Sequence, residues 1–113
     1  MTPRLTSAML VSSLIRLVDQ AGGSATVLKK GNSGAGAILL YCSERGRFTS
    51  LQERVLTGTG CYLWQPIGPD ATHPVNEIDA YLARRRERDG DLWLIELDIA
   101  NAERFAAETI AID

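Results

Sequence analysis

The sequence predicts an α+β fold in the element order α-β-β-β-β-α-β-α, with helices packed mostly on one face of the sheet. Three observations lead to this prediction. Two segments carry apolar residues at the 3.6-residue spacing of amphipathic helices, and several short runs are alternating or continuously apolar, as strands are. Most connections are also too short for a parallel return, so we expect a mainly antiparallel sheet of about five strands.

The N-terminal half is expected to form one helix and three strands. Leu10, Leu14 and Val18 follow helical spacing after a capping residue at Thr6 or Ser7, which predicts a helix to about Ala21. The three strands are expected over Ser24–Lys29, Ala37–Cys42 and from Arg47 to about Leu56, with Glu44-Arg45-Gly46 as a hairpin connection.

The next strand is expected over Cys61–Gln65, and Pro66 should end it because proline cannot donate a ladder hydrogen bond. Together with the two preceding strands it should form an antiparallel meander. Leu92–Ile95 is apolar without alternation, which predicts a central strand covered on both faces.

Two further helices are expected in the C-terminal half. Val75, Ile78 and Leu82 form the apolar stripe of a helix over Val75–Arg88, and Asn101–Ile110 is expected to form a short final helix. We place the first helix and the Val75–Arg88 helix on the same face of the sheet.

The composition indicates one globular domain over residues 1–113, with 45% hydrophobic residues and a net charge of −2. This charge argues against a protein that mainly coats nucleic acid. The apolar run Ala8–Val18 is interrupted by Arg16 and is shorter than the roughly 20 residues that span a bilayer, so we expect a cytoplasmic protein. Cys42 and Cys61 are expected to be buried free thiols, with a disulfide as the alternative, and no cofactor or metal site is predicted.

Three segments resemble a small bacterial protein family of unknown function. They are Leu14-Ile15-Arg16, the turn from Lys30 to Ile38, and Asp79–Arg86 together with Asp89–Glu96. The resemblance spans about Leu5 to Asp98, with Asn32 where an aspartate is expected and Gly90 where a proline is expected. It implies a compact intracellular domain and brings no activity, cofactor or catalytic residue.

The first candidate site is the glycine turn with the two lysines before it, formed by Lys29, Lys30, Gly31, Gly34 and Gly36. Gly31 and Gly36 have the separation of the outer glycines of a phosphate-binding loop. Such a loop continues with a lysine and a hydroxyl residue, whereas Ala37 and Ile38 follow here. Two interpretations remain, an anion cradle and a plain turn that needs glycine for its backbone conformation.

The second candidate is the basic cluster Arg84, Arg85, Arg86 and Arg88. Cations at a helix C-terminus complement the macrodipole, so a solvated helix end is one interpretation. A phosphate or nucleic-acid site is the other, especially if the two lysines lie alongside.

The leading functional hypothesis is a non-enzymatic binding or assembly module, with a homo-oligomer such as a homodimer as one form. The second is an anion or nucleic-acid binder that uses the glycine turn, the lysines and the arginine cluster. The third is a small enzyme of unknown reaction. It is the least supported, because His73 is the only histidine and neither cysteine has an electropositive setting in the sequence.

Overall fold

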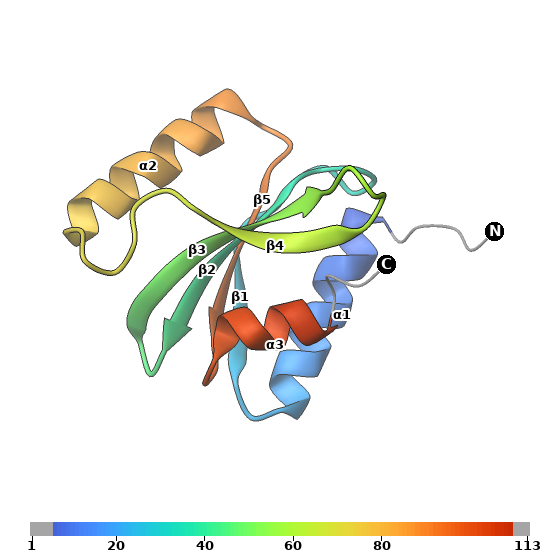
Figure 1. The fold of residues 1–113 in the computed structure, drawn as a ribbon, viewed down its shortest axis with the longest axis horizontal. Coiled ribbons are helices and arrows are strands. Elements are labelled where there is room, and N and C mark those ends of the chain that lie inside the picture. Colours follow the sequence, from blue (N-terminus) through green and yellow to red (C-terminus); the bar gives the residue numbers. More distant parts are fainter. Residues whose placement is uncertain (1–5, 110–113) are drawn as a thin grey trace.

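The computed structural model describes residues 6–109, which fold into three layers with a sheet between helices (Figure 1). The helices are α1 (Ser7–Gln20), α2 (Val75–Arg88) and α3 (Ala102–Thr109). The strands are β1 (Ser24–Lys29), β2 (Ile38–Glu44), β3 (Arg47–Leu56), β4 (Tyr62–Ile67) and β5 (Trp93–Asp98). The predicted α+β class and element order are confirmed.

The five strands form one mixed sheet in the order β1-β5-β2-β3-β4. The predicted meander is confirmed, since β2, β3 and β4 pair antiparallel. After the crossover through α2, β5 pairs parallel to β2, with Leu40 opposite Ile95, and antiparallel to β1. The predicted central strand therefore separates β1 from β2.

Helices cover both faces of the sheet, so the prediction that α1 and α2 share a face was wrong. Leu14 of α1 and Ala106 of α3 pack with Leu40, Trp93 and Ile95 on one face. The core on the opposite face contains Ile78 and Leu82 of α2. These two side chains pack with Leu39 of β2, Leu51 of β3, Leu94 of β5 and Leu92, which directly precedes β5. Because successive strand residues point to opposite faces, one apolar run of β5 supplies both cores.

Three local expectations also need correction. Pro66 lies within β4, opposite Gln52, because this strand is at the edge of the sheet and needs no outward hydrogen bond there. Val75 is 63% exposed and does not extend the buried stripe of α2. Cys61 is exposed before β4, whereas Cys42 is buried as predicted, and both are free thiols. Ile110, at the end of the expected final helix, lies outside the described residues.

Candidate functional site

The glycine turn caps helix α1 and satisfies its own backbone amides. The carbonyl oxygens of Ser33 and Gly34 accept hydrogen bonds from the first amides of α1, at 3.0 and 3.1 Å. The side-chain oxygen of Asn32 accepts hydrogen bonds from the amides of Gly34 and Ala35, at 3.0 and 3.1 Å. These amides are engaged inside the protein, as expected for a structural turn rather than an anion cradle.

Gly31 and Gly36 lie against the connection between α2 and β5. A Cβ atom at either position would lie 2.2 Å from the carbonyl oxygen of Asp91. The Asn32 amide donates to that same carbonyl at 3.0 Å, and the Trp93 indole donates to the Asn32 carbonyl at 2.8 Å. The glycines are thus explained by close backbone approach.

Lys29 links the same two segments. The Nζ of Lys29 donates to the carbonyl oxygens of Gly90 and Leu92, at 2.7 and 3.0 Å, while Lys30 is exposed. The glycine turn and the arginine-bearing end of α2 therefore lie at the same end of the sheet. The ammonium group of Lys29 stabilises the contact between the end of β1 and the α2–β5 connection.

Arg84, Arg85 and Arg86 point to different sides of α2, and Arg88 lies about one turn after Arg84. Arg85 forms a two-pronged ion pair with Glu53 of β3, with its nitrogens 3.1 and 3.3 Å from the carboxylate oxygens. Hydrogen bonding to Glu53 raises the pKa of Arg85. Arg84, Arg86 and Arg88 are exposed. Arg84 and Arg86 are separated by about 200° around the helix axis, so they do not share one face.

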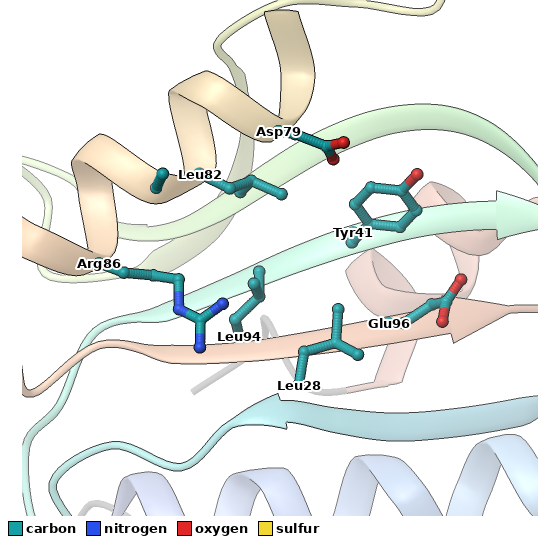
Figure 2. Close-up of a pocket in the computed structure, with 8 residues that line it drawn as sticks. Leu28, Tyr41, Asp79, Leu82, Arg86, Leu94 and Glu96 are labelled. Carbon is teal, nitrogen blue, oxygen red and sulfur yellow. The ribbon is translucent and has the colours of Figure 1, made fainter. Parts of the chain in front are cut away.

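Arg86 lines a groove between α2 and the β1–β5–β2 part of the sheet (Figure 2). We call this the α2 groove; its volume is about 520 Å³. Its lining residues are Leu28 of β1, Tyr41 of β2, Leu94 and Glu96 of β5, and Asp79, Leu82, Ala83 and Arg86 of α2. The three leucines give it an apolar centre.

The charged groups of the α2 groove lie toward opposite ends. Figure 2 shows Tyr41, Asp79 and Glu96 toward one end and Arg86 toward the other. Burial, followed by the nearby carboxylates of Glu96 and Asp79, raises the pKa of Tyr41. Glu96 accepts a long hydrogen bond from Ser43, at 3.4 Å. Among residues 6–109, the side chains of Asp79 and Arg86 form no hydrogen bond or ion pair.

Of these lining residues, only Arg86 was among the predicted site residues. The others come from four segments, and sequence spacing alone does not place four segments together. A partial signal existed in α2, because Asp79, Ala83 and Arg86 are spaced by four and three residues and so share a helix face.

The residues considered for catalysis lie in other settings. The His73 ring is 3.1 Å from the carboxylate of Asp70, on an exposed loop. Hydrogen bonds from Thr72, then one from His73, lower the pKa of Asp70 to about 2. Burial raises the pKa of Cys42 to about 12, so its thiol is protonated at neutral pH.

Asp98, at the end of β5, has a structural role. The carboxylate of Asp98 accepts hydrogen bonds from the amides of Arg45 and Gly46, at 2.8 and 2.7 Å, and holds the β2–β3 hairpin.

Over residues 6–109, no three histidine, cysteine or acidic residues gather where they could hold a metal ion. No helix in that range is long and apolar enough to cross a membrane.

Comparison with known proteins gives a consistent family. The chain is similar to the crystal structure of a DUF1491 family protein from Caulobacter crescentus, with 29% identity, a TM-score of 0.78, and coverage of 90% of this chain and 94% of that one. It is also similar to the solution structure of a protein from A. tumefaciens, with 32% identity, a TM-score of 0.74, and coverage of 98% and 97%.

An NMR structure of a DUF1491 family protein from Caulobacter crescentus is similar too, with 30% identity, a TM-score of 0.74, and coverage of 92% and 94%. No curated protein matches the chain significantly. The family model described as "Protein of unknown function (DUF1491)" matches residues 5–107. The chain therefore belongs to the DUF1491 family of proteins of unknown function.

Proposed function

We propose that this chain is a cytoplasmic, non-catalytic binding module whose ligand site is the α2 groove. One observation carries the proposal: an apolar centre lies between charged groups of opposite sign, Asp79 and Arg86, which have no hydrogen-bond or ion-pair partner among residues 6–109. Concave sites with a mainly apolar lining and a few converging polar groups are the usual form of ligand sites.

The positions of these groups indicate the chemistry of the ligand. Asp79 and Arg86 are seven residues apart on α2, so their α-carbons are separated by about 10 Å along the helix axis. A complementary ligand carries a cation near Asp79 and Glu96, an apolar middle against the leucines, and an anion near Arg86. Arginine favours carboxylate and phosphate groups because its planar donors match them in pairs.

The anion or nucleic-acid hypothesis has less support. It needs Lys29, Lys30 and the four arginines to present their charges together. Arg85 is instead paired with Glu53, and the Nζ of Lys29 is engaged by backbone carbonyls. Arg84 lines a separate depression with His73 and Glu77, away from Arg86.

A series of linear α,ω-aminoalkanoates tests the proposed site, because each probe carries an ammonium, an apolar chain and a carboxylate. Titrations of ¹⁵N-labelled protein should show the tightest binding for the probe whose charges are separated by about 10 Å. The amide shifts should centre on Leu28, Tyr41, Leu94 and Glu96.

Two tryptophan variants of α2 complete the test. Ala83→Trp fills the α2 groove and should weaken binding by about tenfold or more, which corresponds to about 1.4 kcal/mol. The matched control is Ala80→Trp, one turn earlier, because Ala80 is exposed and lines the depression that contains Arg84. Equal loss in both variants, or shifts located away from the groove, would contradict the proposal.

A further inference from the structure

The sheet has two edge strands, and they differ in their ability to accept another strand. β4 contains Pro66, which has no amide hydrogen to donate. β1 contains no proline, pairs only with β5 within residues 6–109, and leaves Val27 and Leu28 40% and 42% exposed. An edge strand without proline keeps its outward backbone donors and acceptors, so β1 is better suited than β4 to strand addition.

The open edge of β1 borders the α2 groove. Leu28 lines the groove, and Thr26 is paired with Glu96, which also lines it. A strand added beside β1 would therefore extend the groove wall and direct alternate side chains toward it. The pairing of β1 with β5 is regular over Ser24–Val27 and resumes at Lys29, beyond a bulge.

We infer that the ligand of the α2 groove is an extended segment of a partner protein that pairs with β1. This inference rests on the proposed function and names its ligand class. The segment carries a basic, an apolar and an acidic side chain at alternate positions, with the basic side chain directed to Glu96 and Asp79 and the acidic one to Arg86.

The register of the sheet fixes the order of these charges along β1. Thr26, in the middle of β1, is opposite Glu96, so the acidic end of the groove adjoins the middle of β1. Lys29, the last residue of β1, is opposite Leu94, so the apolar centre of the groove adjoins the C-terminal end of β1. Alternate strand residues are separated by about 7 Å, so three of them span about 13 Å. This length is comparable with the 10 Å or so between Asp79 and Arg86.

A second copy of this chain fits the groove less well. If two β1 strands paired with each other, the partner would present its own groove-side residues Ser24, Thr26 and Leu28 and, beyond the bulge, Lys29, which is opposite Leu94. The first three are uncharged, and the Lys29 ammonium is already held by the carbonyls of Gly90 and Leu92, so Glu96 and Asp79 would receive no free cation. Charge complementarity therefore favours a segment of another protein.

The test uses the peptide acetyl-Thr-Lys-Thr-Val-Thr-Glu-Thr-amide and a second peptide with the same residues in reverse order. NMR titration of the labelled protein should show that one of them binds, and the binding order reports whether the added strand is parallel or antiparallel. The Arg86→Glu variant should weaken binding by about tenfold or more, and replacing the peptide glutamate by lysine should restore it.

Backbone N-methylation separates strand addition from simple occupation of the groove. Only alternate amides of an added strand point toward β1, so methylating one alternate set should weaken binding by about tenfold or more. Methylating the other set should change it by less than about threefold. Equal effects of the two sets would overturn strand addition, as would a free protein that already dimerises through β1.

The aminoalkanoate titration distinguishes failure of this inference from failure of the proposed function. If the aminoalkanoates bind in the groove and neither peptide binds, the peptide inference is wrong and the groove remains the binding site. If neither class of probe binds, both proposals fall. If the peptide binds with shifts centred on Arg84 and His73, strand addition at β1 is wrong.

Discussion

Substitution of Gly36 by alanine should destabilise the protein strongly, because the new Cβ would lie 2.2 Å from the Asp91 carbonyl oxygen. It would also lie 3.0 Å from both the nitrogen and the oxygen of Asn32. All three neighbours are backbone atoms, so a flexible side chain cannot relieve the overlap. The turn and the α2–β5 connection must therefore separate by about 1 Å, and overpacking of this kind costs about 1–3 kcal/mol.

This separation also weakens the hydrogen bonds that join the two segments. The Asn32–Asp91 and Trp93–Asn32 hydrogen bonds are 3.0 and 2.8 Å long, and each contributes about 0.5–1.5 kcal/mol. We expect Gly36→Ala to lower the free energy of unfolding by about 2–4 kcal/mol, measured by urea denaturation at 25 °C. The corresponding fall in Tm is about 8–16 °C.

Gly34→Ala is the matched control within the same turn. A Cβ at Gly34 meets only the Asn32 side-chain oxygen, at 3.5 Å, which is an ordinary contact. Alanine at this position meets no steric overlap and slightly restricts the unfolded chain, which is a small stabilising effect. The free energy of unfolding should therefore stay within about 1 kcal/mol of the wild-type value. The steric explanation is refuted if Gly36→Ala costs less than about 1 kcal/mol or if both variants behave alike.

Two further predictions concern the ion pair that holds α2 and the two thiols. Glu53→Gln removes the charge that pairs with Arg85, whose side chain is only 21% exposed, and should lower the free energy of unfolding by about 1–3 kcal/mol. The control is Glu108→Gln, in an exposed ion pair, which should leave the urea midpoint unchanged. Equal changes in the urea midpoint of the two variants would contradict this reasoning. Cys61 should react rapidly with a thiol reagent at pH 8, whereas Cys42, buried and with a pKa of about 12, should react only as the protein unfolds; comparable rates would show that Cys42 is accessible.

The sequence predicted the elements well because their signals are local. The bounds of α2 and of strands β1 and β3 match the prediction, since helical spacing and strand patterns act over a few residues. It predicted the central position of β5 from four consecutive apolar residues. Four consecutive apolar residues also indicate that both faces of β5 are covered by helices. The prediction that α1 and α2 share one face did not use this signal.

The site was harder to predict because it depends on long-range placement. The spacing of Gly31 and Gly36 suggested phosphate binding, but their requirement for glycine comes from the Asp91 carbonyl, far along the chain. The arginines appeared as one cluster because they are adjacent in sequence. On a helix, adjacent residues point about 100° apart, so Arg84, Arg85 and Arg86 separate onto different sides.

The most direct test of the α2 groove as the ligand site is the contact map of a bound probe. Isotope-filtered NOE spectra of leucine-methyl-labelled protein with the tightest-binding aminoalkanoate should show contacts to Leu28, Leu82 and Leu94, which line the groove. Leu56 and Leu63, 51% and 42% exposed near the β3–β4 connection, provide the competing apolar surface. Contacts confined to those two leucines would contradict the proposed site.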